Sequence, residues 1–389
     1  MSIDLKQIIT VEEANTIKLY PKRGIALTKG EGVYVFDSNG KRYLDFMTNL
    51  GVNILGYSNP SITKAIYKQL ETIPSTHQTF YSEARADLLR ELRTILPLNL
   101  NQVIFTNSGT ESIEAALKLA MAATGKNGFV AAVNAYHGRT LGSLSVTGQQ
   151  KYKDSFPSLL PNIVHVPFND VKALRMSLSE NTAAVILEPI QGEAGIILPD
   201  QDYFKKVKDI CQSHGILLIL DEVQSAIRTG NWFAFEQLDV IPDILCLSKS
   251  FSYGIPFGLV VTTVKVGSLM PKGGHGSTFG GNPLACIAAG EVIKQIKKMK
   301  LLLNASKMGR YFLDQLNQLK HPAILKVRGK GLMIGLQLKE NTTPYLKKMQ
   351  ENGLIAASSS SDTIRFLPPI TVTKKGIDQA LSIIKEVFS

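Results

Sequence analysis

Short apolar runs alternate with helix-length amphipathic segments along most of this chain. Seven apolar runs of strand length are each bounded by polar or turn-forming residues. They cover residues 103–106, 129–133, 163–166, 184–187, 216–223, 244–247 and 259–261. Such runs fit strands that are buried on both faces of a mostly parallel sheet. The pattern therefore predicts an α/β protein whose large three-layer α/β/α domain contains a seven-stranded sheet.

The pattern changes after about residue 290, where amphipathic helices surround a few short strands, including 333–338 and 363–367. A further strand-like run lies near the start of the chain, at 33–36. We expect residues 290–389 to form a smaller α+β domain to which residues 1–50 contribute. Residues 51–289 are then the large domain.

Two of the apolar runs in the large domain end in a charged residue. One ends at Asp221 and the other, 28 residues later, at Lys249. Ligands of parallel sheets bind beyond the strand ends, and a buried charge is costly unless a partner or ligand compensates it. Two explanations are open at this point. One is a structural Lys249–Asp221 salt bridge. The other is a lysine that binds pyridoxal phosphate covalently while the carboxylate keeps the ring nitrogen protonated.

A second candidate site follows the first strand of the large domain. Ser108 and Glu111 match a capping box at the start of an amphipathic helix. Gly109 would leave backbone N–H groups open at this helix N-terminus, where the helix dipole favours a phosphate. The same pattern also fits an ordinary capped helix. A glycine cluster at 329–335 has the wrong spacing for a dinucleotide loop and leads into a strand, so we assign it to backbone packing.

Composition bounds the class of protein. With 389 residues, 44% hydrophobic and 19% charged, the chain fits a large domain plus a smaller one. No apolar run approaches the roughly 20 residues that span a bilayer, and the first residues lack a signal-peptide core, so we expect a cytoplasmic protein. Three cysteines and six histidines are dispersed, which predicts neither a disulfide framework nor a metal site.

The chain is basic, with a net charge of +11 and a lysine-rich stretch at 294–300. No aromatic residues interleave with these lysines, and binding of nucleic acid through them would have to weaken steeply with salt. The stretch instead reads as the solvated face of an amphipathic helix whose buried side is Ile293, Ile296, Met299 and Leu301. We interpret the charge as a bias toward anionic ligands.

Several motifs in the same order resemble the class III, or omega, aminotransferases of the fold-type I pyridoxal-phosphate family, and in particular the acetylornithine aminotransferase group. They include NSGTE at 107–111, HGRT at 137–140, EPIQGE at 188–193, DEVQ at 221–224, Lys249, HGSTFGGNP at 275–283 and RFLPP at 365–369. The resemblance runs along nearly the whole chain. It favours the cofactor-binding explanation for Lys249.

The resemblance implies roles around the cofactor. Lys249 would bind it and carry the substrate proton as general base and acid, with Asp221 on the ring nitrogen. Gln224 would contact the ring hydroxyl, and Tyr136, which alone reads as a core aromatic, would stack on the ring. The phosphate would be held by Ser108, Gly109, Thr110 and, from the second subunit of a homodimer, Thr278.

The resemblance also implies how substrates bind. Arg139 would bind a substrate carboxylate, with Ser277 as an added polar contact. Arg365, which alone would read as a surface ion pair, would receive the α-carboxylate of glutamate. Glu193 would mask Arg365 while the ω-amino substrate is bound.

These roles imply an aminotransferase that moves the ω-amino group of an N-acyl diamino acid, foremost N-acetylornithine, to 2-oxoglutarate, giving a semialdehyde and glutamate. Alternatives are ornithine or 4-aminobutyrate aminotransferase, or a lysine or ornithine biosynthetic relative whose substrate is linked to an acidic amino-group carrier protein, which the +11 charge favours. A catalytically silent homologue that binds the cofactor is a further alternative, against which the intact Lys249 and Asp221 argue.

Two segments beside the expected cofactor depart from the family pattern. Gln224 is followed by SAIRTG, which is one residue shorter than the usual TGxGRTG, and Lys249 by SFSYG instead of a glycine-rich run. Both changes add bulk or stiffness. We expect the cofactor chemistry to survive and the substrate pocket to be reshaped.

Overall fold

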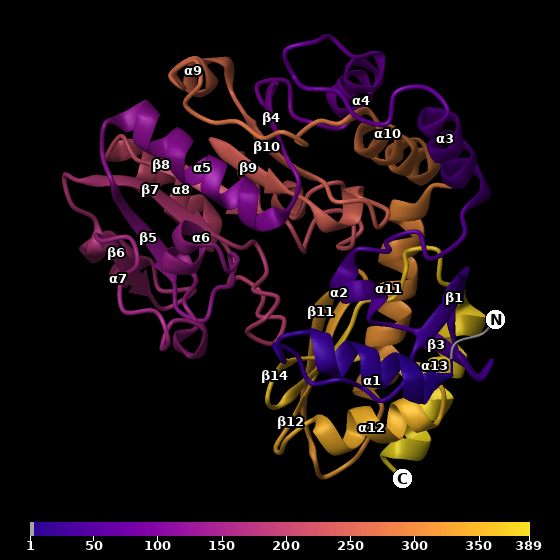
Figure 1. Cartoon of the computed structure of the whole chain (residues 1–389). Helices are drawn as coiled ribbons and strands as arrows, with labels where there is room; N and C mark the ends of the chain where they lie inside the picture. The colour runs from indigo at the N-terminus through magenta and orange to yellow at the C-terminus, as the bar shows by residue number, and fades with distance from the viewer. Residues whose placement is uncertain (1–3) are drawn as a thin grey trace.

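The computed structural model describes residues 4–389 and has two parts, a larger one built on a seven-stranded sheet and a smaller one formed by both ends of the chain (Figure 1). Residues 1–3, on which the expectation of a chain without a signal peptide partly rests, lie outside the described residues. Among residues 4–389, no helix is both long and apolar enough to cross a membrane.

The large sheet has the strand order β4-β10-β9-β8-β7-β5-β6. Its strands are β4 (Gln102–Thr106), β5 (Gly128–Ala132), β6 (Ile163–Val166), β7 (Thr182–Leu187), β8 (Leu217–Asp221), β9 (Ile244–Leu247) and β10 (Gly258–Thr262). All seven predicted strands and the α/β fold class are confirmed. Only β10 runs antiparallel to its neighbours, β4 and β9, so the sheet is mostly parallel.

Helices cover both faces of this sheet. Leu218 and Leu220 of β8 belong to one buried cluster together with Phe204 of α8 (Tyr203–Ser213). Ile219 points to the opposite face and belongs to a second cluster with Ile113 of α5 (Gly109–Thr124). This alternation follows from the two-residue period of a strand. The remaining helices of this part are α3 (Pro60–Leu70), α4 (Glu83–Arg93), α6 (Leu141–Val146), α7 (Val171–Ser177), α9 (Val264–Gly267) and α10 (Pro283–Lys298).

The smaller part contains two four-stranded sheets. In one, β3 (Arg42–Asp45) pairs in parallel with β13 (Leu354–Ile355), so the N-terminal segment is joined to the C-terminal one. That sheet also holds β1 (Leu27–Glu31) and β2 (Tyr34–Asp37). The other sheet holds β11 (Ile324–Lys330), β12 (Met333–Leu338), β15 (Thr363–Phe366) and β14 (Ala357–Ser360). The helices of the smaller part are α1 (Leu5–Asn15), α2 (Thr48–Gly51), α11 (Leu301–Asn317), α12 (Thr343–Glu351) and α13 (Lys374–Val387).

The glycine cluster at 329–335 forms the β11–β12 hairpin, as its assignment to backbone packing predicts. The prediction that Met299 lies on the buried side of the lysine-rich helix is wrong, because α10 ends at Lys298 and Met299 is 52% exposed. Ile293, Ile296 and Leu301 are buried, as predicted. Helix α10 also runs across the predicted boundary at residues 289/290, and the domain boundaries stay predictions.

Candidate active site

Asp221 and Lys249 lie at the same edge of the large sheet, because Asp221 ends β8 and Lys249 follows the neighbouring parallel strand β9. Within residues 4–389 no ion pair joins them. The Asp221 carboxylate instead lies 2.8 Å from Nδ1 of His137, and its other oxygen accepts a hydrogen bond from the Val223 backbone N–H at 3.0 Å. The salt-bridge explanation is therefore wrong.

His137 and Glu188 belong to this cluster, although the sequence assigned them no role. His137 is buried, and its Nε2 has no partner among the described residues. The Glu188 carboxylate accepts hydrogen bonds from the backbone N–H groups of Tyr136 (2.9 Å) and Gly192 (3.0 Å). Burial raises the pKa of Glu188 to about 7. Glu188 follows the apolar run of β7, so the rule that finds Asp221 and Lys249 would also have found it.

Lys249 is positioned as a reactive amine. Burial lowers its pKa, and the positive charge of Arg365 lowers it further, against the opposing effect of Glu193. A lowered pKa makes the neutral, nucleophilic form of the amine easier to reach.

The N-terminus of α5 lies against the loop that follows Asp221. Ser108 caps the helix, with its hydroxyl accepting from the Glu111 N–H at 3.3 Å. A Cβ at Gly109 would lie 2.7 Å from a Val223 methyl group, so only glycine lets the helix approach the loop after β8 this closely. Half of the predicted capping box is made, because the Glu111 carboxylate accepts from the Asn107 N–H (2.6 Å) rather than from that of Ser108.

Thr110, one residue further along α5, lies in a group of hydroxyls. Its Oγ1 is 2.6 Å from the Ser143 hydroxyl and 2.9 Å from that of Thr140. Backbone N–H groups at a helix start and several hydroxyls together suit a phosphate. With a buried carboxylate at Asp221 and an amine at Lys249, the residues present fit the phosphate, ring nitrogen and aldehyde of pyridoxal phosphate.

Arg365 enters the site from β15 and is almost fully buried. Its Nη1 donates to Oε1 of Glu193 at 2.5 Å and to Oε1 of Gln224 at 3.0 Å. Burial alone would raise the pKa of Glu193, but Arg365 and Lys249 outweigh it and lower that pKa. The charged carboxylate of Glu193 therefore pairs with the Arg365 guanidinium, and its role as a mask stays a prediction.

Arg139 lies among three tyrosines. Its Nη1 donates to the Tyr20 hydroxyl at 3.0 Å, and its guanidinium carbon lies 4.9 Å from the ring centre of Tyr152 and 5.9 Å from that of Tyr136. Tyr136 and Tyr152 pack edge to face at 5.6 Å. Burial lowers the pKa of Arg139, but the tyrosines outweigh it and raise that pKa. Tyr20 lies 119 residues before Arg139, and no sequence pattern pointed to it.

Among residues 4–389 of one chain, Ser277 and Thr278 form no hydrogen bond with the other predicted site residues. The Ser277 hydroxyl accepts from the Asn107 side chain at 2.8 Å. Thr278 is exposed, next to Phe279, which is 62% exposed. Within the described residues, no hydrogen bond joins either residue to Arg139, Arg365 or Lys249.

Comparison with known proteins finds similarity to aminotransferases along nearly the whole chain. Residues 19–388 match the family described as Aminotransferase class-III. An acetylornithine aminotransferase from Methanosarcina acetivorans is 41% identical over 381 residues, which cover 97% of this chain and 95% of that protein. A Pyrococcus furiosus protein whose curated name proposes a LysW-aminoadipate semialdehyde/glutamate semialdehyde transaminase is 39% identical over 373 residues, covering 96% of this chain and 98% of that protein.

The fold also resembles solved structures. The ornithine aminotransferase of Toxoplasma gondii, described with partial occupancy of PLP at its active site, superposes with a TM-score of 0.94 at 30% identity. The match covers 99% of this chain and 94% of that one.

Proposed function

This chain belongs to the class III aminotransferases and is a pyridoxal-phosphate-dependent transaminase, and we propose that it moves the ω-amino group of an N-acyl diamino acid, N-acetylornithine, to 2-oxoglutarate. The observation that carries this proposal is the tyrosine-lined environment of Arg139, which forms no ion pair with a carboxylate among residues 4–389. The products are a semialdehyde and glutamate.

The cofactor, when bound, supplies an electron sink for charge that develops on the substrate carbon. We assign its contacts to Ser108, Gly109, Thr110, Tyr136, Asp221, Gln224 and Lys249. Lys249 Nζ takes a proton from the substrate carbon and returns one, and its lowered pKa suits this exchange. His137, on the far side of the Asp221 carboxylate, orients it for the ring nitrogen.

The donor end of the proposal rests on charge. Arg139 and the Tyr20 hydroxyl can bind a carboxylate together. The ionisable groups that raise the pKa of Arg139 are tyrosines, so the free α-ammonium of ornithine would lack a carboxylate partner there. An N-acyl group removes that charge, which favours N-acetylornithine over ornithine.

The acceptor end uses Arg365. Glu193 neutralises its guanidinium while the donor is bound, so that the site does not hold an unpaired buried cation. A swing of Glu193 would free Arg365 for the α-carboxylate of 2-oxoglutarate or glutamate. One site can thus serve two substrates of different charge.

We further propose a homodimer in which Thr278 and Ser277 complete the site of the partner subunit. Its support is an exposed apolar region in the described chain, where Ile73, Phe80 and Tyr81 are 58%, 67% and 106% exposed. These residues line a groove of about 750 Å³. Exposed aromatic clusters of this kind mark protein interfaces.

A second candidate donor is a diamino acid whose α-amino group is linked to an acidic carrier protein. The Pyrococcus furiosus relative and the net charge of +11 favour it. The argument from Arg139 applies equally, because the carrier linkage also acylates the α-amino group.

The proposal is tested on the purified holoenzyme by its visible spectrum. Adding N-acetylornithine without a keto acid should remove the absorbance of the lysine-bound cofactor, whereas ornithine and 4-aminobutyrate should do so at least about tenfold more slowly. Subsequent 2-oxoglutarate should restore the band. Lys249→Ala should show neither change. Faster reaction with ornithine would contradict the assignment, and reaction only with a carrier-linked substrate would replace N-acetylornithine by the second candidate.

A further inference from the structure

Arg228 is a buried cation whose guanidinium, within residues 4–389, has backbone carbonyls rather than carboxylates as hydrogen-bond partners. Its side chain is 0% exposed, and among the described residues it forms no ion pair. Burial, together with the neighbouring charge of Arg365, lowers its pKa to about 9 against a smaller opposing effect of Asp45. Keeping an uncompensated guanidinium inside a protein costs several kcal/mol, so such a residue needs a compensating role.

The guanidinium joins two segments of the smaller part. Its Nη1 donates to the backbone carbonyl of Pro368 and its Nη2 to that of Gly51, both at 2.9 Å. Pro368 lies three residues after Arg365, so one arm of the fork fixes the segment that leaves β15. Since Arg228 itself follows the loop of Gln224, it connects the cofactor side of the site to the Arg365 side.

The second segment is a strained turn. Thr48, Asn49 and Leu50 have φ of 48°, 51° and 54°, a left-handed conformation that non-glycine residues rarely adopt. The turn is also tied to the first segment, because the Thr48 hydroxyl donates to the Leu367 carbonyl at 2.7 Å. The Thr48–Leu367 hydrogen bond and the two hydrogen bonds of Arg228 together stabilise this turn, whose left-handed conformation is unfavourable by itself.

The loop that carries Arg228 is itself constrained. Ile227 is fully buried in a left-handed conformation, with φ of 69°, although β-branched residues strongly disfavour it. The Arg228 carbonyl accepts from the Leu332 N–H at 2.9 Å, which anchors the loop to the start of β12. The guanidinium therefore has little freedom to move away from Pro368 and Gly51.

We propose that Arg228 is a positioning residue for the dicarboxylate acceptor: it holds the segment that carries Arg365 and adds a second positive charge behind it. The two like charges disfavour each other, and the negative charge that offsets them at Arg365 comes from Glu193 until the α-carboxylate of the acceptor replaces it. This inference rests on the proposed role of Arg365 in the second half-reaction. It requires the donor half-reaction, which uses Arg139, to be nearly independent of Arg228.

The test compares Arg228→Lys, which keeps the charge but loses the fork, with Arg228→Gln, which loses both. Glutarate, a non-reacting dicarboxylate, is titrated into each holoenzyme by calorimetry, and the two half-reactions are timed by stopped flow. Arg228→Lys should weaken glutarate binding about 10-fold and Arg228→Gln about 100-fold, while the donor half-reaction changes by no more than about twofold. The second half-reaction should slow in parallel with glutarate binding.

Arg85→Lys is the matched control, because Arg85 is also buried and donates to backbone carbonyls, those of Gly281 and Phe80. It should leave the ratio of the two half-reactions unchanged. If the Arg228 variants do not fold, Thr48→Val removes another bond of the same junction and should still weaken glutarate binding. Equal slowing of both half-reactions, or unchanged glutarate binding, would overturn the inference. Wild type that fails to react with 2-oxoglutarate would instead overturn the proposed function.

Discussion

Glu222, next to Asp221, is a single buried carboxyl that makes the stability of the fold depend on pH. Its oxygens accept from the backbone N–H groups of Ala234 (2.7 Å) and Phe235 (2.8 Å). Burial nevertheless raises its pKa to about 7, above the 4.5 of an ordinary glutamate. Between these two values the folded protein holds a proton that the unfolded chain has lost. Stability from this group is therefore complete below pH 4.5, declines as pH rises to 7, and is constant above.

Glu222→Gln should flatten this dependence. The titration of Glu222 alone lowers the free energy of unfolding of the wild type by about 3 kcal/mol across that window, and glutamine removes it while losing one acceptor. Melting temperatures measured from pH 4.5 to 7.5 should fall less with pH in the variant. Glu180→Gln, at an exposed position far from this 3₁₀ turn (Ala234–Gln237) in the sequence, should keep the wild-type slope. Identical slopes for Glu222→Gln and wild type would contradict the assignment.

Individual site residues differ in how far the sequence could reveal them. Asp221 and Lys249 were found because each ends an apolar strand, and Glu188 obeys the same rule without having been recognised. Nothing local marks Tyr20, whose hydroxyl reaches Arg139 only through the path of the N-terminal segment. The roles of the residues proposed from the family resemblance stay predictions that the experiments above test.

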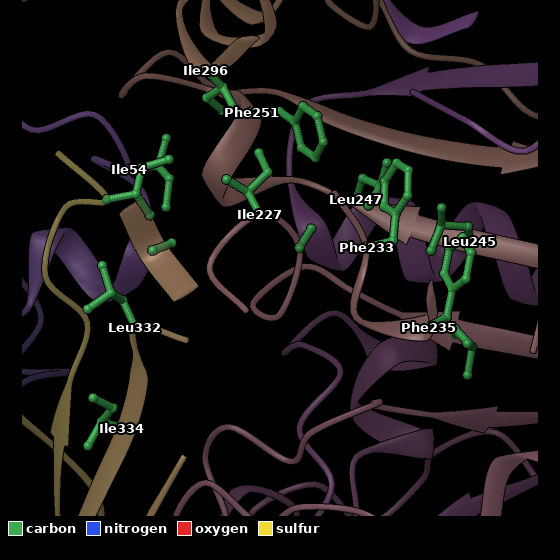
Figure 2. Close-up of a cluster of buried hydrophobic side chains, with 14 of the residues drawn as sticks. Ile54, Ile227, Phe233, Phe235, Leu245, Leu247, Phe251, Ile296, Leu332 and Ile334 are labelled. Atoms are coloured by element: carbon green, nitrogen blue, oxygen red, sulfur yellow. The ribbon is translucent and has the colours of Figure 1, made fainter. Parts of the chain in front are cut away.

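At the scale of elements, the seven strands of the large sheet were predictable from apolar periodicity, but the antiparallel direction of β10 was not, since direction depends on connections across the fold. The two departures from the family pattern have a shared structural result. Ile227 and Phe251 are both fully buried and lie in one hydrophobic cluster with Ile54 and Leu332, between the two parts of the molecule (Figure 2). The extra bulk therefore fills the junction.

Ile227 should be worth less to stability than an unstrained isoleucine of the same cluster. Removing a buried isoleucine side chain costs about 2–5 kcal/mol, but glycine at 227 also relieves about 1–2 kcal/mol of left-handed strain. Ile227→Gly should consequently lower the melting temperature less than Ile54→Gly, because Ile54 has no positive φ to relieve. Equal or larger destabilisation by Ile227→Gly would show that the conformation at 227 is not strained.

At the scale of the whole molecule, the smaller part is assembled from both ends of the chain, and this is where sequence reasoning reaches least far. Strand β3 pairs with β13 across about 310 residues, and Arg228 reaches Gly51 and Pro368 from a third region. Local patterns predict strands but not such partners, because long-range pairing follows from packing of the complete chain. Thr278 and Phe279 are exposed in the single chain, and which residues of a second chain they would contact cannot be read from local sequence patterns either.

The proposed homodimer with shared active sites has a genetic test. Lys249→Ala removes the reactive amine, and Thr278→Asp would place a negative charge against the cofactor phosphate, so each variant alone should be inactive. Co-expressed, they should form mixed dimers in which one site has an intact Lys249 and receives an intact Thr278 from the other chain. About a quarter of the wild-type activity should return, because half of the dimers are mixed and half of their sites are intact. Pairing Lys249→Ala with Asp221→Ala should restore nothing, since these two residues share one chain's sheet edge. Light scattering that gives the mass of one chain, together with absent rescue, would refute both the dimer and the role of Thr278.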